Sequence, residues 1–227
     1  MQQNRPMPGT ATRTETVIAA TPAHQDVRPQ ATWPRLALSS LGAFVLITVI
    51  VHLLRPDLDV VDDQMSLYLI GPWGHLLQTA YCVLSVGMLA LVHGLQRDLA
   101  PTARSRACRG LFVTAAVALC ITAFAWMDMP EATVTLQGDI HHIAATTAFL
   151  CATMGIIWQA HTFGRDARWR RHRRWALPWG VLCFASLWAM GACPDTLNGL
   201  GQKAVIVLML GWLAAVSLVL LGHARRA

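Results

Sequence analysis

Charged residues are scarce in this sequence. Lys, Arg, Asp and Glu make up 13% of its 227 residues, whereas hydrophobic residues make up 55%. A chain of this size with so few charges has too little polar surface to enclose a water-soluble fold. The composition therefore argues against a soluble protein and predicts an integral membrane protein.

Sequence motifs for common cofactors are also missing. The six cysteines form no CxxC or CxxCH motif, so thiol redox chemistry and covalent haem attachment have no support. Only Cys193 is expected near the outer surface, so we do not expect a disulfide framework. No HExxH or HxxxH pattern is present to hold zinc on a helix. We therefore expect neither a metal nor a cofactor.

The sequence instead contains six apolar segments near the length of about 20 residues that crosses a hydrocarbon core. Each is expected to be a helix, because lipid offers the backbone no hydrogen-bond partner. The segments are 36–54, 75–95, 107–126, 140–160, 175–192 and 200–221. The predicted fold is an all-α bundle of six transmembrane helices over residues 35–223.

Basic residues are distributed unevenly between the two sides of the predicted bundle. Sixteen of the 18 fall in the N-terminal tail, the second and fourth connections and the C-terminus, and only Arg55 and Lys203 lie opposite. Short cytoplasmic loops retain Lys and Arg, so both termini are expected in the cytoplasm. Because the basic residues are spread among loops, nucleic acid is not an expected partner.

Two segments outside the predicted helices have distinct compositions. Residues 1–34 are rich in Pro, Thr, Ala and Gln, with little apolar burial to offset the entropy of ordering, and we expect a disordered cytoplasmic tail. The loop 55–74 is acidic and turn-rich but also contains apolar residues. We expect part of that loop to lie along the membrane surface.

The fourth predicted helix opens with the sequence GDIHH, which places polar groups beside an apolar span. At 100° per residue, His141 shares a face with Ala148 and other small residues, and such a face lets neighbouring helices approach closely. His141 is therefore expected to point into the bundle, and His142 to lie at the edge of that interface. Asp139 is expected to cap the helix N-terminus.

A row of polar residues follows helical spacing along the second predicted helix. His75, Gln78, Cys82 and Ser85 share one face, which is expected to avoid lipid. Two interpretations remain open. The side chains form hydrogen bonds between helices, or they line a cavity.

Asp128 and Lys203 are the notable charges at the depth of the outer rim. We hypothesise that these two residues converge with His75 and His141 on one pocket in the outer leaflet. His75, His141 and Asp128 nominally supply the three ligands of a zinc hydrolase, but no zinc motif supports that assignment.

Four stretches of sequence together resemble one known family. They are RPDLD and MSLYLIGPWG after the first apolar segment, GDIHH at the start of the fourth, and GLGQKAVIVLMLGW at the start of the sixth. In this order they resemble the bacterial six-span family known as domain of unknown function 998. The resemblance covers roughly residues 36–221. It implies a fold, a topology and a place in the bacterial cytoplasmic (inner) membrane, but not an activity.

The resemblance extends to single positions. These are Ser66, Tyr68 and Gly71 for Ser-x-Tyr-x-x-Gly, Gly138 and His141 for Gly-x-x-His, and Gln202 and Lys203 for a polar-basic pair. Two positions depart from the family pattern. Lys203 stands where Arg is more usual, and Leu67 stands where an acidic residue is common, which weakens any role for a catalytic acid there.

Three functions remain open from the sequence. The first is binding or handling of a lipid or small amphiphile in a pocket open to the outer leaflet, with His141 and Lys203 contacting an anionic headgroup. The second is a membrane-embedded hydrolase in which Ser66 or a metal-bound water attacks and His141 transfers protons. The third is a structural or sensory bundle held in register by its polar groups.

Membrane lipids are the expected partners, a lipid or small-molecule ligand belongs to the first two functions, and the oligomeric state is open. The residues expected to contact a ligand are Ser66, Tyr68, His75, Gln78, Asp128, His141 and Lys203.

Overall fold

The described part of the chain consists of helices and the segments that connect them. The computed structural model describes residues 30–129, 133–192 and 197–226, and no strand occurs among them. These residues form six long helices: α1 (Thr32–Leu54), α2 (Gly74–Asp98), α3 (Arg106–Phe124), α4 (Leu136–Thr162), α5 (Arg173–Gly191) and α6 (Asn198–Arg226). Short 3-10 helices lie between them: η1 (Met65–Leu69), η2 (Pro101–Ala103), η3 (Phe163–Arg165) and η4 (Arg170–His172).

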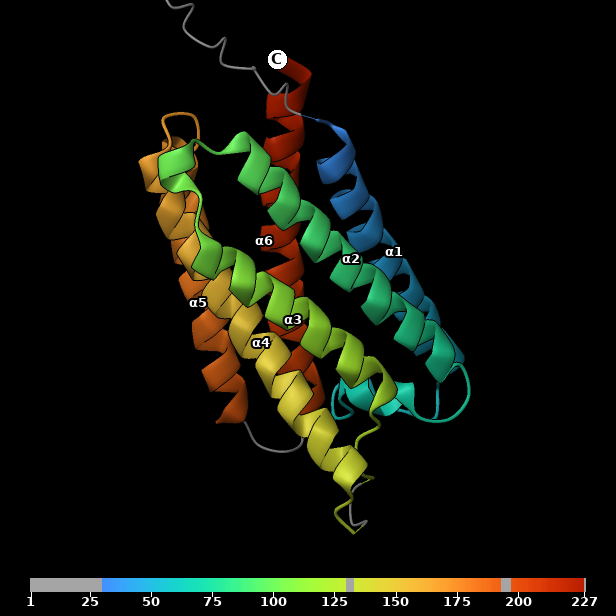
Figure 1. Ribbon diagram of the computed structural model, residues 1–227. Coiled ribbons are helices and arrows are strands. Elements are labelled where there is room, and N and C mark those ends of the chain that lie inside the picture. The colour runs from blue at the N-terminus through green and yellow to red at the C-terminus, as the bar shows by residue number, and fades with distance from the viewer. Residues whose placement is uncertain (1–29, 130–132, 193–196, 227) are drawn as a thin grey trace, which may run out of the picture.

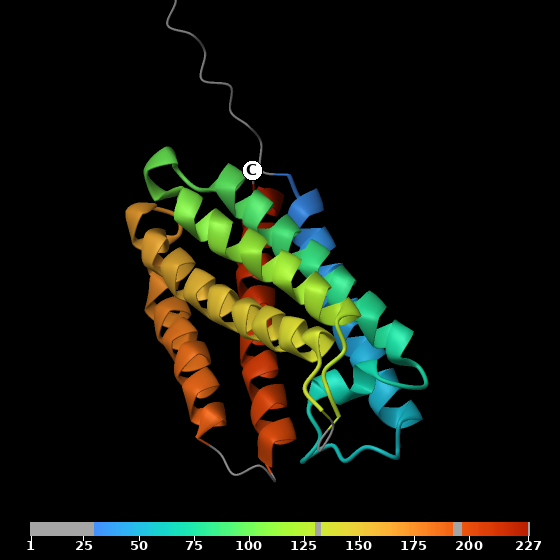
Figure 2. The same ribbon diagram turned by 60° about the horizontal axis from the view of Figure 1, so that its bottom comes forward.

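The long helices run alternately up and down and pack side by side (Figures 1 and 2). Each helix packs against its neighbour in sequence, and α6 also packs against α1 and α2. Contact between the first and last helices closes the bundle.

The two ends of the bundle carry different connections (Figure 1). The end with both described termini also carries the α2–α3 and α4–α5 connections, and it is termed the arginine end after the basic residues in 97–109, 165–174 and 225–226. The opposite end is termed the η1 end. It carries the loop 55–73 with η1, together with the α3–α4 and α5–α6 connections.

Each of the six predicted segments corresponds to one of these helices, with two segments running one or two residues past the ends of α3 and α5, and the prediction of an all-α fold is confirmed. Five helices are long and apolar enough to cross a membrane by length and composition, and α5 is not among them. Two arginines begin α5, and Pro178 and three tryptophans interrupt its aliphatic residues. The described residues therefore contain five candidate spans rather than the six expected.

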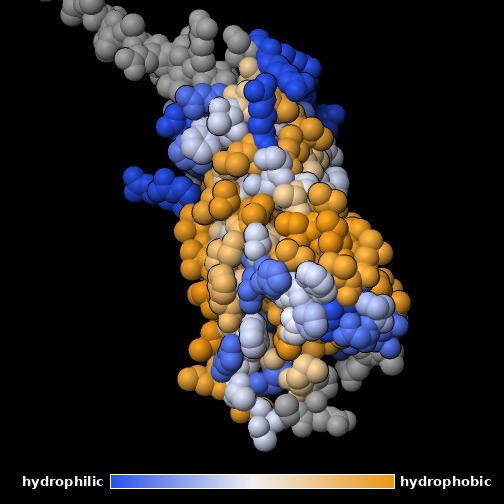
Figure 3. All heavy atoms as spheres, turned by 90° about the vertical axis from the view of Figure 1, so that its right-hand side faces the viewer, coloured by the Kyte–Doolittle hydropathy of each residue, from blue (hydrophilic) through white to orange (hydrophobic). Residues whose placement is uncertain are grey.

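The middle of the bundle surface is apolar. Figure 3 shows hydrophobic side chains over most of the middle of one face and hydrophilic side chains toward its ends. Exposed apolar residues occur along the long helices, for example Leu46, Val117, Ile143 and Val207. Soluble monomers rarely expose large contiguous apolar patches, so this surface is consistent with a membrane protein.

Small residues let the helices approach closely. A Cβ at Gly87 of α2 would lie 2.7 Å from the Cβ of Ser40 on α1, and one at Gly180 of α5 would lie 2.9 Å from Ile156 on α4. Neither contact leaves room for a side chain. Moving an apolar side chain from lipid into a helix interface gains little hydrophobic free energy, because lipid is equally apolar. Close packing between helices supplies van der Waals attraction instead.

Candidate functional site

The loop between α1 and α2 folds into the η1 end of the bundle. All five residues of η1 are buried, and Tyr68 is 0% exposed. This part of the loop therefore packs inside the bundle, and a position along the membrane surface stays a prediction for the rest of the loop. Met65, Tyr68 and Leu69 join the apolar core of the bundle, where their side chains avoid both water and the lipid headgroups.

The first turns of α6 hold this loop in place. The N–H groups of Gly199 and Leu200 donate to loop carbonyl oxygens at 3.2 and 2.7 Å. The Lys203 ammonium donates to the carbonyl oxygens of Val60 and Asp63 at 2.9 and 2.6 Å. The first N–H groups of a helix have no hydrogen-bond acceptors within the helix, and here the loop carbonyls are the acceptors. Loop carbonyls also accept hydrogen bonds from the charged Lys203 ammonium.

Arg55 anchors the loop from its other side. This residue is 7% exposed, and its guanidinium donates to the Asp57 carboxylate at 2.8–3.0 Å and to the Ile70 carbonyl at 2.6 Å. The hydrogen bond to Asp57 raises the pKa of Arg55, and the same contact lowers the pKa of Asp57. Gly71, which follows Ile70, has a φ of 81°, a conformation that glycine adopts without steric cost.

Thr135, and not Asp139 as expected, caps the N-terminus of α4. The Thr135 hydroxyl oxygen accepts from the Gly138 N–H at 3.1 Å, and Asp139 lies within the first turn. Asp128 accepts from the Thr135 hydroxyl and N–H at 2.6 and 3.0 Å, and these hydrogen bonds lower the pKa of Asp128. A Cβ at Gly138 would collide with the Asp128 carboxylate, so this position requires glycine.

Ser66 and His141 meet at the centre of the η1 end. Ser66 comes from η1 and His141 from the second turn of α4, and they are 4% and 5% exposed. His141 Nε2 lies 3.0 Å from Ser66 Oγ, and Nδ1 lies 2.5 Å from the carbonyl oxygen of Ala125. The prediction that His141 points into the bundle is confirmed, whereas its neighbour His142 is exposed.

The contact with Ala125 decides which nitrogen of His141 carries the proton. A carbonyl oxygen only accepts hydrogen bonds, so Nδ1 must be the N–H donor. In the neutral imidazole Nε2 is then the acceptor, and the Ser66 hydroxyl donates to it. This is the arrangement in which a histidine can act as a general base toward a serine.

A cleft of about 540 Å³ opens beside this pair. Its described lining comes from α4, α5 and α6, from the loop with η1, and from the segment after α3. Asp128 and Asp139 lie in this lining, and it contains no Lys or Arg. The cleft is therefore suited to a neutral or positively charged group.

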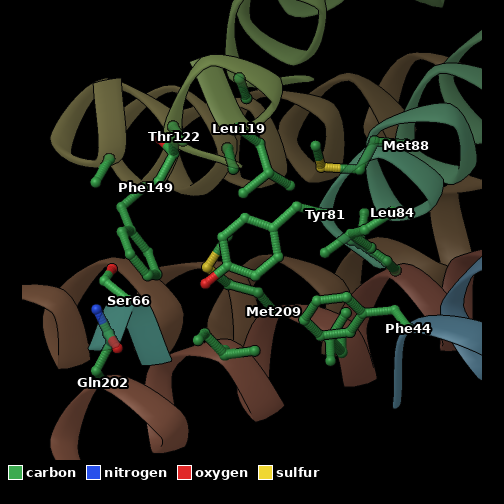
Figure 4. A pocket seen from close by; sticks show the side chains of 17 residues that line it. Phe44, Ser66, Tyr81, Leu84, Met88, Leu119, Thr122, Phe149, Gln202 and Met209 are labelled. Atoms are coloured by element: carbon green, nitrogen blue, oxygen red, sulfur yellow. The ribbon is translucent and has the colours of Figure 1, made fainter. Parts of the chain in front are cut away.

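A smaller cavity of about 70 Å³ lies within the bundle (Figure 4). Ser66, Ala145, Phe149 and Gln202 line both this cavity and the cleft. The two spaces therefore share a wall at Ser66. Apart from a few polar residues, the cavity lining is aliphatic, aromatic or methionine.

Gln202 is a site residue that was not among those expected to contact a ligand. Its Oε1 accepts the Met65 N–H at 2.7 Å, so its amide nitrogen is the atom left to face the shared wall. In Figure 4 this nitrogen lies on the same side as the Ser66 hydroxyl. Its place beside Lys203 in the polar-basic pair was the signal available in the sequence.

The structure brings together three of the seven residues expected to contact a ligand. Ser66, Asp128 and His141 line the cleft. Tyr68 stacks on His52 with ring centroids 4.2 Å apart, and Lys203 Nζ lies over the Tyr68 ring, 5.5 Å from its centroid. Neither Tyr68 nor Lys203 belongs to the described lining of the cleft.

The two candidates on α2 lie elsewhere. His75 is exposed beside Trp73, and Gln78 is half-buried, and neither lines the cleft or the cavity. Further along the same helix, the Ser85 hydroxyl donates to the Ala116 carbonyl of α3 at 3.0 Å. At Ser85 the polar row forms a hydrogen bond between helices, and Cys82 and Ser85 also line a separate hollow of about 960 Å³ between α2, α3 and α4, so each of the two interpretations has support. Within the described residues, no three His, Cys, Asp or Glu side chains are grouped to hold a metal ion.

Comparison with known proteins adds one finding. The family model described as protein of unknown function (DUF998) matches residues 38–219. The chain belongs to the DUF998 family. No curated protein and no solved structure matches it.

The DUF998 resemblance noted in the sequence involves positions that all lie at the η1 end. Ser66 and His141 form the central pair, Gly138 makes room for Asp128, and Gln202 and Lys203 hold the loop. Most of these residues build the walls of the site. Ser66, His141 and Gln202 present polar atoms to it.

Proposed function

We propose that this DUF998 protein is a membrane-embedded hydrolase that cleaves an acyl ester or amide, with Ser66 as nucleophile and His141 as general base. The observation that carries the proposal is the 3.0 Å contact between Ser66 Oγ and His141 Nε2, together with the Ala125 carbonyl that holds the proton on Nδ1. A serine hydroxyl is a weak nucleophile until a neighbouring base accepts its proton.

The reaction proceeds in two steps that need only water as co-reactant. Ser66 Oγ forms a bond to the acyl carbon while its proton moves to His141 Nε2, and the carbonyl oxygen takes the electron pair. The bond to the alcohol or amine then breaks, and this leaving group takes the proton from His141. Water repeats the sequence on the Ser66 ester, which releases the carboxylic acid and restores the serine.

The Ala125 carbonyl takes the place of a carboxylate as the group that orients the histidine. It fixes the tautomer and the ring plane, and its dipole favours the imidazolium that forms when His141 accepts the proton. A neutral carbonyl stabilises that charge less than a carboxylate would. The proposed hydrolase is accordingly expected to be slow.

The charges around the cleft favour some head groups over others. Asp128 and Asp139 line it, and the hydrogen bonds from Thr135 keep the Asp128 carboxylate charged. The Lys203 ammonium is bound to loop carbonyls and lies outside the described lining. We therefore propose a neutral or cationic head group in place of the anionic one considered from the sequence.

The test uses the full chain in detergent or lipid nanodiscs and a methyl phosphonate ester with a p-nitrophenolate leaving group, which forms a stable adduct with an activated serine. Mass spectrometry is expected to find the adduct on Ser66, and Ser66→Ala and His141→Ala are expected to abolish it. Ser85→Ala is the matched control, because Ser85 is a buried serine that donates to a carbonyl. Absence of any Ser66 adduct would overturn the hydrolase.

Binding of a lipid or small amphiphile without chemistry is the second candidate. The volume of the cleft supports it, since about 540 Å³ falls within the range of small-molecule sites. Lipid that copurifies with Ser66→Ala and is not cleaved by the wild-type chain would favour this candidate. If nothing copurifies with either chain and neither binds lipid analogues, binding is excluded.

We also propose that α5 completes a set of six spans in a bacterial cytoplasmic membrane, with both termini in the cytoplasm. The support is the packing of α5 between α4 and α6 and the gathering of arginine at one end. Single cysteines placed at Arg170 and Asp62 in a cysteine-free chain test the orientation. An impermeant thiol reagent is expected to label only position 62 in intact cells, and the reverse result would invert the topology.

A further inference from the structure

The cavity inside the bundle has a polar end and an apolar end. Ser66 and Gln202 lie together at one end, and the Tyr81 hydroxyl points toward them (Figure 4). Met88 and Phe44 lie toward the other end, away from these polar groups. A carbonyl group attached to an aliphatic chain has the same division between a polar and an apolar part.

The cavity extends along the bundle away from Ser66. Ala148 and Ala152 line it from one face of α4, about 10 and about 16 Å along the helix axis from His141. On α6 the lining runs from Gln202 to Leu213, again about 16 Å. The small alanine side chains on α4 leave a narrow space at the depth that an aliphatic chain bound at Ser66 would reach.

Gln202 presents a donor at the polar end of the cavity. Its Oε1 accepts the Met65 N–H, and no hydrogen bond of Nε2 is found among the described residues. The side chain is 8% exposed, so this donor is largely removed from water. A donor that has no protein acceptor and lines a cavity beside a nucleophile is suited to a developing oxyanion.

Resting on the hydrolase proposed above, we infer that the acyl chain of the substrate lies in the internal cavity while its neutral or cationic head group lies in the cleft. Gln202 Nε2 donates to the carbonyl oxygen, which becomes the oxyanion when Ser66 attacks. The substrate class is an acylated membrane amphiphile. The shared wall at Ser66 places the scissile bond between the two spaces.

The empty cavity is narrow, about 70 Å³, so a chain must widen it. Met88 and Met209 line it, and methionine side chains are unbranched and flexible enough to repack around a guest. The surrounding helices need not separate for this to happen. Short chains are expected to enter first, and longer ones as the methionines move.

A series of phosphonates with methyl, hexyl and dodecyl chains on phosphorus tests whether the cavity holds the chain and limits its length. Ala148→Leu is expected to slow labelling of Ser66 by the hexyl and dodecyl probes about ten- to a hundredfold and to spare the methyl probe. Ala152→Leu lies deeper and is expected to slow only the dodecyl probe. Ala144→Leu is the matched control, since Ala144 is buried on the same helix but lines neither space.

The outcomes separate this inference from the proposed hydrolase. If Ser66 reacts with every probe and neither alanine change alters the dependence on chain length, the cavity is not the acyl site, and the hydrolase stands. If Ser66 reacts with none of the probes, both fail. Thermal unfolding of each variant in detergent shows whether it is folded. If Ala148→Leu does not fold, the chain-length dependence is measured with Ala152→Leu.

Gln202→Glu tests the donor separately. Glutamate keeps an oxygen for the Met65 N–H but replaces the amide N–H₂ with a second carboxylate oxygen. Labelling of Ser66 is expected to fall about a hundred- to a thousandfold at neutral pH, with the chain-length preference unchanged. Labelling at the wild-type rate by this variant, when folded, would overturn the role of Gln202.

Discussion

The two ends of the bundle each bury a histidine in a polar cluster, and the clusters differ in what they leave unpaired. At the arginine end, the Asp98 carboxylate accepts from His223 Nδ1, Trp169 Nε1 and Arg168 Nη2 at 3.0, 2.6 and 3.0 Å. The Asp98 side chain is 2% exposed. At the η1 end, Ser66, His141 and Gln202 are similarly buried but face two empty spaces.

This difference separates polar groups that hold the fold from polar groups available for chemistry. Asp98 joins α2 to the α4–α5 connection and to α6, and none of its partners lines the cleft or the cavity. A buried carboxylate with three donors is a stabilising contact, because each donor would otherwise lose its partner. The Gln202 amide nitrogen and the Ser66 hydroxyl instead adjoin space that a substrate can fill.

The largest expected effect comes from exchanging the two histidines for glutamine. His141→Gln removes the general base and is expected to slow phosphonate labelling of Ser66 about a hundred- to ten-thousandfold. His223→Gln at the other end is expected to leave that rate unchanged, because His223 contacts Asp98 and not the site. Equal losses in the two variants would mean that His141 acts only through the fold.

For the free energy of unfolding, the larger loss is expected at the arginine end and the smaller loss at the η1 end. Asp98→Asn replaces the carboxylate that three donors share and is expected to lower the free energy of unfolding by about 3 kcal/mol. Ser66→Ala loses one hydrogen bond to His141, which is worth about 1 kcal/mol. Denaturant unfolding in detergent measures both. A larger loss for Ser66→Ala would make the η1 end the main structural cluster and undo the distinction.

Local sequence patterns were sufficient to predict the helices and the direction of His141. The helical period places His141 on the face of Ala148 and Ala152, and small residues on a transmembrane helix mark the side that meets other helices. These properties depend on neighbours within a few turns. The same reasoning indicated His141 as a site candidate, whereas Ser66 was indicated by the family motif.

Long-range hydrogen bonds account for most of what the sequence did not predict. Met65 and Gln202 are 137 residues apart, and nothing near either residue indicates that they meet. Lys203 was expected to face a ligand, but two loop carbonyls occupy its ammonium. Aspartate is a residue type that often caps helices, but α4 begins before Asp139 because the Thr135 hydroxyl accepts a hydrogen bond from the Gly138 N–H. The outcomes at Gln202 and Lys203 depend on contacts with a distant segment, which helical periodicity does not encode, whereas the cap at Thr135 is a local choice between two candidate residues.

Lys203 offers a smaller test of the contrast between the two ends. Lys203→Met leaves the Val60 and Asp63 carbonyls without this donor and is expected to lower the free energy of unfolding by about 1–3 kcal/mol. Lys203→Arg is the control, since guanidinium can donate to both carbonyls. Anionic lipid is expected to stabilise the wild-type chain and Lys203→Met equally. Selective loss of that effect in Lys203→Met would restore Lys203 as a headgroup contact.

The smallest expected effect is the pH dependence contributed by Asp128. Hydrogen bonds from Thr135 lower the pKa of Asp128 in the folded chain, so the unfolded chain takes up a proton first as the pH falls. The stabilisation from Asp128 is therefore complete above the ordinary pKa of about 4 and is lost as the pH falls through the lower folded-state value. Thermal unfolding midpoints measured across this range are expected to fall less steeply with acid in Asp128→Asn.

Thr135→Val separates the pairing of Asp128 from its charge alone. This variant keeps the carboxylate and the backbone N–H but removes the hydroxyl that donates to Asp128 at 2.6 Å. Its pH dependence is expected to lie between those of the wild-type chain and Asp128→Asn. Because the Thr135 hydroxyl also caps the helix that carries His141, its loss is expected to disturb the contact with Ser66 as well. Acid profiles that coincide in all three chains would mean that Asp128 does not hold α4 in place.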